Sequence, residues 1–207
     1  MLCVETDRMD VMNGVVAIRV DSSEQIGSGH LMRCLTLAER LRKDGGEIHF
    51  ISRDLIGSLH RLVTEHEFSL HLLPRHEAQA NLTGYAAWLT VSQTMDAEET
   101  VSILSQIPPV DRLVVDSYAL DIVWEQQMRP LVREIFVIDD LANRQHDCDI
   151  LLDQNFYREM QHRYDGLVPP KCKLLLGPPH ALLREEFYAA RAHLRERDGR
   201  LRRILVF

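Results

Sequence analysis

The chain has 207 residues, a formal net charge of −7 and 45% hydrophobic residues. This length allows one large domain, or one and a half small ones, with a sizeable buried core. The negative charge gives no general electrostatic basis for nucleic-acid binding.

No stretch of the sequence approaches the roughly 18 apolar residues of a membrane-spanning helix. The first segment, "MLCVETDRMDVMNG", carries acidic residues and no sustained apolar run, which is unlike a secretory signal. The four cysteines (Cys3, Cys34, Cys148 and Cys172) are far apart in the sequence and form no CxxC pair. We therefore expect reduced thiols and a cytoplasmic protein without a membrane partner.

Strand and helix patterns alternate along the chain. The predicted strands are 15–20, 47–52, 69–73, 112–116, 134–140, 149–153 and 173–176. The predicted helices are a segment from Leu31 to the glycines at 45 and 46, 55–66, a segment from Asp96 to the prolines at 108 and 109, 122–133 and 184–197. The start at Asp96 rests on a capping box with Glu99, and 74–94 has no regular pattern.

Near-continuous apolar strands that alternate with helices are typical of a parallel sheet covered on both faces. The expected fold class is therefore α/β, with a Rossmann-like parallel sheet. Ligands of such sheets bind outside the carboxyl ends of the strands. This rule selects three places: 21–30, 116–118 and 139–144.

The last residues, 204–207, form an apolar run that looks like a buried strand. An unpaired buried strand at the end of a chain invites aggregation. We therefore expect either that the chain is the front part of a longer protein or that this strand pairs with another partner.

The segment "GSGHLM" follows the first strand and opens a helix. It is not a dinucleotide fingerprint, because Met32 stands where the third glycine would be. Gly27, Ser28 and Gly29 are binding candidates, since glycine lets the backbone approach a ligand and a helix N-terminus favours phosphate. The same dipole favours a neutral imidazole at His30, which would then be a general base.

A base at this helix end needs an orienting acceptor, and the sequence does not identify one. The alternative is that His30 is a helix-capping residue with no chemistry. Asp21 would hydrogen-bond the turn, cap it or bind substrate. Arg33 would approach the phosphates or lie on a solvated helix face. Arg19, inside an apolar strand, favours a structural ion pair.

The sequence predicts no metal site and no cofactor. Asp139 and Asp140 have no supporting ligand spacing and favour a structural role. The run "HDCD" at 146–149 leads directly into an apolar strand and lacks the spaced ligand pairs of a tetrahedral site. Trp88 would either touch a ligand or pack in the core.

The segment "IRVDSSEQIGSGHLMRCLTLAERLR" resembles the start of the UDP-2,4-diacetamido-2,4,6-trideoxy-β-L-altropyranose hydrolases of pseudaminic acid biosynthesis. Further matches follow in order: "WLTVSQTMDAEET", "LVVDSYALD", "VIDDLANRQHDCDILLDQN" and "YDGLVPPKCKLLLGPPHALLREEF". The matches run from about Val15 to Phe187.

The resemblance implies the N-terminal domain of a GT-B-type two-domain fold. Residues 1–14 would be an extension, 15–200 the Rossmann-like domain, and 201–207 the first strand of a nucleotide-binding C-terminal domain that this chain lacks. His30 matches the catalytic histidine of that family, and Tyr118 matches a tyrosine that faces the sugar. The implied reaction hydrolyses the UDP-sugar by water attack at the anomeric carbon, with inversion.

Two other functions remain open from the sequence. One is a GT-B glycosyltransferase in which His30 activates an acceptor hydroxyl of a second substrate. The other is an incomplete binding domain that is inactive without its C-terminal half.

Overall fold

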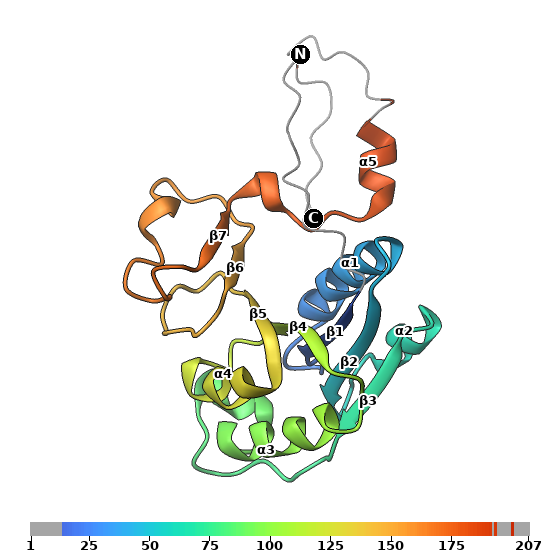
Figure 1. The fold of residues 1–207 in the computed structure, drawn as a ribbon, viewed down its shortest axis with the longest axis vertical. Helices are drawn as coiled ribbons and strands as arrows, with labels where there is room; N and C mark the ends of the chain where they lie inside the picture. The colour runs from blue at the N-terminus through green and yellow to red at the C-terminus, as the bar shows by residue number, and fades with distance from the viewer. Residues whose placement is uncertain (1–13, 192, 194–199, 201–207) are drawn as a thin grey trace.

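A parallel sheet forms the centre of the molecule. The structure is a computed structural model that describes residues 14–191, 193 and 200. Its seven strands lie in the order β3-β2-β1-β4-β5-β6-β7, and every neighbouring pair is parallel (Figure 1). The strands are β1 (Val15–Val20), β2 (Glu47–Arg53), β3 (Ser69–Leu73), β4 (Val110–Asp116), β5 (Val132–Ile138), β6 (Ile150–Asp153) and β7 (Lys173–Leu176). The predicted Rossmann-like parallel sheet is confirmed.

Helices cover both faces of this sheet. The α-helices are α1 (Gly29–Lys43), α2 (His60–Glu65), α3 (Gln93–Leu104), α4 (Ile122–Met128) and α5 (Glu185–Arg191). Short 3-10 helices are η1 (Gly84–Leu89), η2 (Arg129–Leu131), η3 (Met160–His162) and η4 (Pro178–His180). Successive strand residues point to opposite faces. Val16 and Ile18 therefore pack with α1 and α2, whereas Ala17 packs with α3 and α4.

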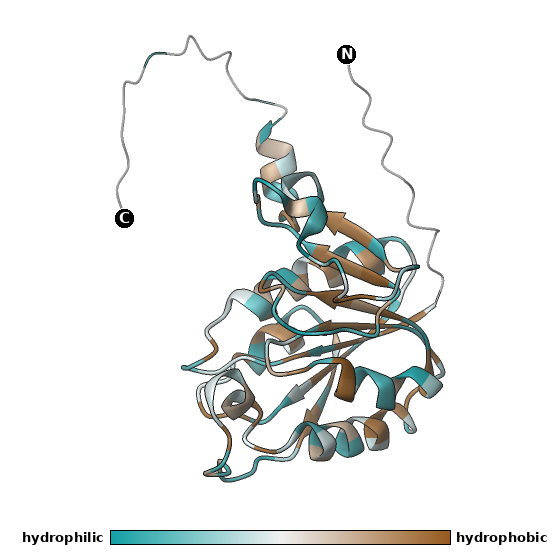
Figure 2. Ribbon diagram, turned by 90° about the vertical axis from the view of Figure 1, so that its left-hand side faces the viewer, coloured by the Kyte–Doolittle hydropathy of each residue, from teal (hydrophilic) through white to brown (hydrophobic). Residues whose placement is uncertain are grey.

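The two hydrophobic clusters on the faces of the sheet hold the fold together. Figure 2 shows the hydrophobic strands in the interior and the more polar residues on the outer sides of the helices and in the loops. Strands β1 and β4 are almost wholly buried. Strands that are buried on both faces have nearly continuous apolar sequences, and this pattern is what predicted the sheet.

Two predicted helices are too long. The helix predicted at 55–66 begins only at His60, because Gly57 has a φ of +74° in the preceding turn. The helix predicted at 122–133 ends as an α-helix at Met128. Pro130 follows, and proline lacks the N–H that would continue the helix and disfavours the α conformation before it. Strand β5 begins at Val132.

The predicted start of the third long helix is wrong. Helix α3 begins at Gln93, and the Oγ of Ser92 accepts a hydrogen bond from the backbone N–H of Met95 at 3.2 Å. Asp96 is not a cap, because it is fully buried in an ion cluster described below. Ser92, four residues before Asp96, is the N-cap, and its hydroxyl provides an acceptor for one of the unpaired backbone N–H groups at the start of the helix.

Several predictions fall on residues outside the described part of the chain. These are the extension at 1–13, most of the segment predicted as a helix after Arg191, and the segment 201–207 with its strand. The proposed domain boundaries at 14/15 and 200/201 therefore stay predictions.

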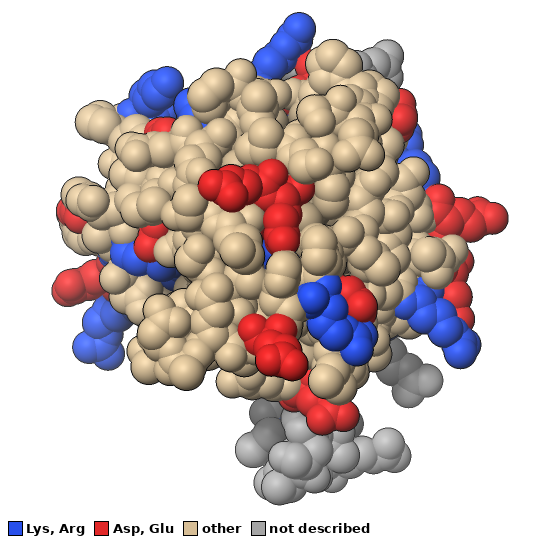
Figure 3. Space-filling view, turned by 90° about the horizontal axis from the view of Figure 1, so that it is seen from below, with Lys and Arg blue, Asp and Glu red and all other residues tan. Residues whose placement is uncertain are grey.

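The surface carries charges of both signs. Figure 3 shows one face of the molecule, where acidic and basic side chains are interspersed over a largely uncharged surface and acidic groups lie near its centre. Among the described residues, none of the helices combines the length and the apolar character that crossing a membrane requires.

Candidate active site

His30 lies at the edge of the sheet where the carboxyl ends of β1 and β4 meet. It is the second residue of α1, which follows β1 through the glycine turn. Val20 at the end of β1 is the register partner of Asp116 at the end of β4. This adjacency brings the Nδ1 of His30 to 2.6 Å from the Oδ1 of Asp116. Asp116 is thus the orienting acceptor that the sequence did not identify.

Arg33, about one helical turn after His30 in α1, also binds the carboxylate of Asp116. Its Nε donates to Oδ2 of Asp116 and its Nη2 to Oδ1, each at 2.6 Å. The Sγ of Cys34 also donates to Oδ2, at 3.4 Å. The Arg33 side chain is largely buried, so the interpretation of a solvated helix face is wrong. Its guanidinium also lies 3.2 Å from Nδ1 of His30 and 3.8 Å from Oδ2 of Asp140. A part for Arg33 in phosphate binding stays a prediction.

Asp116 is ionised in this setting. Burial alone would raise its pKa, but the hydrogen bonds from Arg33 and His30 outweigh burial and lower the pKa below the usual range of an aspartate. A carboxylate can only accept a hydrogen bond. The short contact therefore places the imidazole proton on Nδ1 of His30.

A histidine ring that carries its single proton on Nδ1 presents the lone pair of Nε2 as a proton acceptor. The residue is only 8% exposed. Nε2 has no hydrogen-bond partner among the described residues. It is not completely buried, so it is accessible to solvent. The ring is therefore oriented on one side and available as an acceptor on the other.

Two aromatic rings pack against His30. The ring of Tyr118 packs edge-on against the imidazole, with centroids 4.6 Å apart, and Trp88 lies at 6.1 Å. The hydroxyl of Tyr118 donates to Oδ1 of Asp140 at 2.5 Å. Burial and this carboxylate raise the pKa of Tyr118, which keeps the phenol protonated. The predicted pair His30 and Tyr118 is brought together.

The glycine turn leaves open space at the start of α1. Gly27 has a φ of +79°, which favours glycine, and its N–H donates to the carbonyl of Ser23 at 2.8 Å. A Cβ at Gly27 or Gly29 would meet no atom within 4 Å. Ser28 is the N-cap but makes no side-chain cap bond. The first amides of α1 are thus not capped by a side chain, and this is the arrangement that binds anions.

Asp21 belongs to a different cluster. Its Oδ1 accepts from Nη1 of Arg19 at 2.6 Å and from the backbone N–H of Arg53 at 2.7 Å. Arg19 also bonds both oxygens of Asp96, at 3.2 and 2.7 Å. The predicted ion pair of Arg19 is confirmed. Asp21 is buried, and these contacts give it a structural role. A contact of Asp21 with substrate stays a prediction.

The carboxylates after β5 also have internal partners. Asp139 is fully buried and accepts from Nη1 of Arg144 at 2.7 Å and from the hydroxyl of Tyr164. In "HDCD", Nδ1 of His146 contacts Oε1 of buried Glu125 at 2.7 Å. Among the described residues, no group of three or more His, Cys, Asp and Glu side chains fits a metal ion.

Three cysteines fall in the described part of the chain, and all three are free thiols: Cys34, Cys148 and Cys172. Two of them meet in space although 24 residues separate them, with the Sγ atoms of Cys148 and Cys172 3.6 Å apart.

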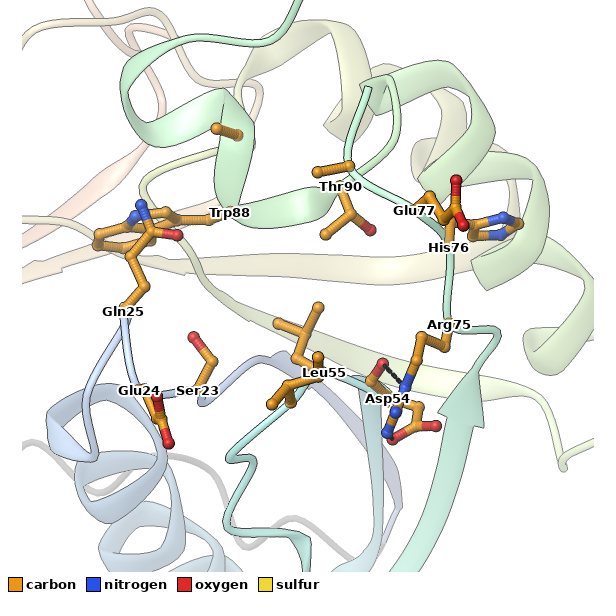
Figure 4. A pocket seen from close by; sticks show the side chains of 13 residues that line it. Ser23, Glu24, Gln25, Asp54, Leu55, Arg75, His76, Glu77, Trp88 and Thr90 are labelled. Atoms are coloured by element: carbon orange, nitrogen blue, oxygen red, sulfur yellow. Dashed lines mark hydrogen bonds and ion pairs between the residues drawn. The ribbon is translucent and has the colours of Figure 1, made fainter. Parts of the chain in front are cut away.

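Two cavities flank the His30 cluster, and His30 itself lines neither. The larger, of about 600 Å³, lies outside the ends of β1, β2 and β3 and is bounded on one side by η1 (Figure 4). Trp88 lines this cavity, and its ring centroid lies 6.1 Å from that of His30. The smaller, of about 400 Å³, lies between α1 and the segment before α5, and Gly29 and Arg33 line it.

Comparison with known proteins gave one informative relative. No protein-family model matches the chain. The curated UDP-2,4-diacetamido-2,4,6-trideoxy-beta-L-altropyranose hydrolase of Campylobacter jejuni is 29% identical over 182 residues, which is 88% of this chain and 56% of that protein. The chain therefore spans about half the length of the curated relative it matches.

Solved structures give weaker similarities. MurG of Acinetobacter baumannii aligns with a TM-score of 0.49 and 12% identity, over 77% of this chain and 44% of that one. The N-terminal domain of trehalose-6-phosphate phosphatase of Candida albicans aligns with a TM-score of 0.42 and 13% identity, over 70% and 40%. The fold assignment rests on the sheet itself. The resemblance carried by the motifs is confirmed: over most of its length, this chain is similar to a UDP-2,4-diacetamido-2,4,6-trideoxy-beta-L-altropyranose hydrolase.

Proposed function

We propose that this chain is the catalytic part of a UDP-sugar hydrolase, which converts UDP-2,4-diacetamido-2,4,6-trideoxy-β-L-altropyranose to UDP and the free sugar in pseudaminic acid biosynthesis. The observation that carries the proposal is the His30–Asp116 pair at 2.6 Å, with Nε2 of His30 free to accept a proton. The similarity to the curated hydrolase supplies the substrate class.

The proposed step is a single displacement. Nε2 of His30 takes a proton from water as the water oxygen attacks the anomeric carbon. The bond from the anomeric carbon to the β-phosphate oxygen breaks, and its electron pair leaves with UDP. Attack opposite the leaving group inverts the anomeric centre. UDP is a stable anion, so no general acid is required, unlike the two carboxylates of an ordinary inverting glycosidase.

Asp116 and Arg33 act as positioning residues in this proposal. Asp116 fixes the proton on Nδ1 of His30 and stabilises the imidazolium that forms when Nε2 accepts a proton. Arg33 keeps Asp116 ionised and in place. Tyr118 presents its ring to the imidazole and the sugar, while its hydroxyl remains on Asp140.

The diphosphate would lie at the N-terminus of α1. The open space beside Gly27 and Gly29 and the amides of the first turn support this placement. We propose that the uridine is held mainly by a C-terminal domain of a GT-B-type fold, since this chain spans 56% of its relative. No metal, cofactor, nucleic acid or membrane has a part in the proposed reaction, and we place it in the cytoplasm.

The test is product analysis in ¹⁸O-labelled water. The full-length gene product is incubated with the UDP-sugar and no acceptor, and UDP and the free sugar are analysed by mass spectrometry. We expect the label in the sugar and none in UDP. Label in UDP would contradict attack at the anomeric carbon. Turnover only after addition of an acceptor sugar would identify a glycosyltransferase instead.

Calorimetry with UDP tests the proposed C-terminal nucleotide-binding domain. We expect the chain of 207 residues to bind UDP at least tenfold more weakly than a longer gene product. Equal affinities would contradict a separate nucleotide-binding domain.

A further inference from the structure

Two free thiols meet at the opposite end of the strands from His30. Cys148 lies two residues before β6, and Cys172 directly precedes β7, its neighbour in the sheet (Figure 1). Because neighbouring strands are parallel, both cysteines lie at the amino ends, whereas His30 follows the carboxyl end of β1. The pair therefore has no part in the steps proposed above.

The sheet holds the two cysteines side by side. Ile150 and Lys173 are register partners, and the backbone N–H of Lys173 donates to the carbonyl of Asp149 at 2.8 Å. The Sγ atoms of Cys148 and Cys172 are 3.6 Å apart. A disulfide has its sulfurs about 2.0 Å apart, so they must approach by about 1.6 Å. The existing pairing of the two segments thus brings the thiols almost to bonding distance.

The two thiols differ in access to solvent. Cys148 is fully buried in the core, whereas Cys172 is only partly buried against it. The hydrogen bond that Cys148 donates lowers the pKa of Cys172. Partial burial and the carboxylates of Asp149 and Glu125 act against this but do not outweigh it. A more accessible thiol with a lowered pKa beside a second thiol is the arrangement of redox-sensitive cysteines.

Cys34 provides a contrast within the same molecule. It is fully buried, and its Sγ donates to Oδ2 of Asp116 at 3.4 Å. Burial and this carboxylate raise the pKa of Cys34, which keeps it a thiol. The thiolate is the form that reacts with oxidants. We therefore expect Cys34 to stay reduced under conditions that oxidise Cys172.

We propose that Cys148 and Cys172 form a site of reversible oxidative modification, at which a peroxide converts the two thiols to a disulfide between the segments before β6 and β7. The inference is independent of the proposed function, since it concerns other residues and another end of the sheet. Hydrogen peroxide is the oxidant in the experiments below.

The step balances with two electrons. The thiolate of Cys172 attacks one oxygen of hydrogen peroxide, so an S–O bond forms and the O–O bond breaks. The departing hydroxide takes a proton from solvent and becomes water, which leaves a sulfenic acid on Cys172. The sulfur of Cys148 then attacks the sulfur of Cys172, and the S–O bond breaks. The released hydroxyl takes the Cys148 proton as a second water. A dithiol reductant reverses the change and is itself oxidised to a disulfide.

The disulfide would close a loop of the chain that contains β6 and the segment 154–171. Within this segment, Nη2 of Arg163 donates to the carbonyl of Asp140 at 2.8 Å, and the hydroxyl of Tyr164 bonds Oδ2 of Asp139 at 3.1 Å. A covalent link across such a loop restricts the unfolded chain. We expect oxidation to raise Tm by roughly 4 °C or more.

Peptide mapping gives the first test. The full-length gene product is treated with hydrogen peroxide, unfolded in iodoacetamide, digested and analysed by mass spectrometry. At least half of the molecules should carry a linked pair of peptides that contain Cys148 and Cys172, while Cys34 is alkylated. Dithiothreitol given before the alkylation should return both cysteines to the alkylated form. The proposal is wrong if Cys34 is oxidised while the pair is alkylated, or if Cys172 is oxidised to a sulfinic acid beside a free Cys148.

Two serine variants give the second test, and circular dichroism checks their folding. Cys148→Ser should leave a sulfenic acid on Cys172 that dimedone traps, whereas Cys172→Ser should leave Cys148 reduced. Neither variant should gain Tm on oxidation. Cys172→Ser replaces a partly exposed side chain, so it remains informative if Cys148→Ser does not fold. A gain of Tm in Cys172→Ser equal to that of the wild type would contradict the proposal, as would a disulfide found only between two molecules.

Discussion

Two buried ion clusters lie at the same edge of the sheet and differ in one respect. In the first, Arg19 and Arg53 enclose Asp96, and all three side chains are completely buried. In the second, Arg33 and His30 enclose Asp116, and the imidazole keeps one nitrogen free toward solvent. Both clusters contain a buried aspartate held by an arginine, but only in the second is that aspartate bonded directly to an imidazole that keeps one nitrogen toward solvent.

The difference shows what distinguishes a structural ion cluster from a reactive one. Asp96 receives hydrogen bonds from two arginines and from Nε1 of Trp124, all of which close it off. Asp116 accepts hydrogen bonds from one arginine, Arg33, and from the imidazole of His30. We therefore expect substitutions in the first cluster to affect stability and substitutions in the second to affect catalysis.

Asp96→Asn should have the largest effect on stability. It leaves two buried guanidinium groups without their shared carboxylate, and removing one partner of a buried ion pair costs about 3–5 kcal/mol. Urea unfolding measures the loss. Asp44→Asn, which breaks the exposed pair of Arg40 and Asp44 on α1, is the matched control and should cost under about 0.5 kcal/mol. Equal losses in the two variants would contradict the structural role of the first cluster.

Asp116→Asn should have the largest effect on kcat among the positioning residues. An amide can donate to Nδ1 of His30 and thereby move the ring proton to Nε2, which removes the base. We expect kcat to fall about 10²- to 10³-fold, a range typical of general-base catalysis. Steady-state kinetics on the folded fraction of Asp96→Asn provides the comparison and should show kcat within a few-fold of the wild type. A wild-type kcat in Asp116→Asn would contradict the claim that the Asp116 cluster, unlike the Asp96 cluster, acts in catalysis.

Acid should destabilise both clusters. Burial raises the pKa of Asp96, but Arg19 and Arg53 outweigh burial, so the pKa is lowered overall, as it is for Asp116. The stabilisation is therefore fully present above the unfolded pKa of about 3.9 and is lost as pH falls through the lower folded pKa. Urea unfolding from pH 6 to 2.5 should give a steep fall below about pH 4.

Asp116→Asn should flatten that curve, because each lost carboxylate removes up to about 1.4 kcal/mol per pH unit of slope. Curves that stay parallel for the variant and the wild type would show that Asp116 does not have the lowered pKa on which the cluster depends.

The glycine turn should give the smallest effect. Gly27→Ala places a side chain at a φ of +79° and should cost about 1–2 kcal/mol. Gly29→Ala meets no atom within 4 Å and lies in helix α1, so stability should stay the same or rise. We expect Gly29→Ala nevertheless to raise KM for the UDP-sugar, because its methyl group would enter the proposed diphosphate site. A normal KM would argue against that site.

The sequence predicted the sheet and His30 because both depend on local patterns. Buried strands are apolar runs, and a histidine at a glycine turn before a helix is visible in six residues. The isolated charge of Arg19 in an apolar strand likewise indicated a partner. These signals need no knowledge of which strands are neighbours.

The partner of His30 could not be predicted in this way. His30 and Asp116 are 86 residues apart, and they meet only because β4 lies next to β1 in the sheet. The sequence also predicts a helix cap at Asp96, which is wrong because its partner Arg19 is 77 residues away in the chain. The strand-end rule did select the segment 116–118, but only the strand order shows that Asp116 faces His30.

The most direct test of the account is kcat of His30→Gln in the full-length gene product. Glutamine can keep a hydrogen bond to Asp116 but cannot act as a base. We expect kcat for UDP-sugar hydrolysis to fall at least 10³-fold, while the free energy of unfolding changes by less than about 1.5 kcal/mol. Retention of more than a tenth of the wild-type kcat would contradict the assignment of His30 as the base.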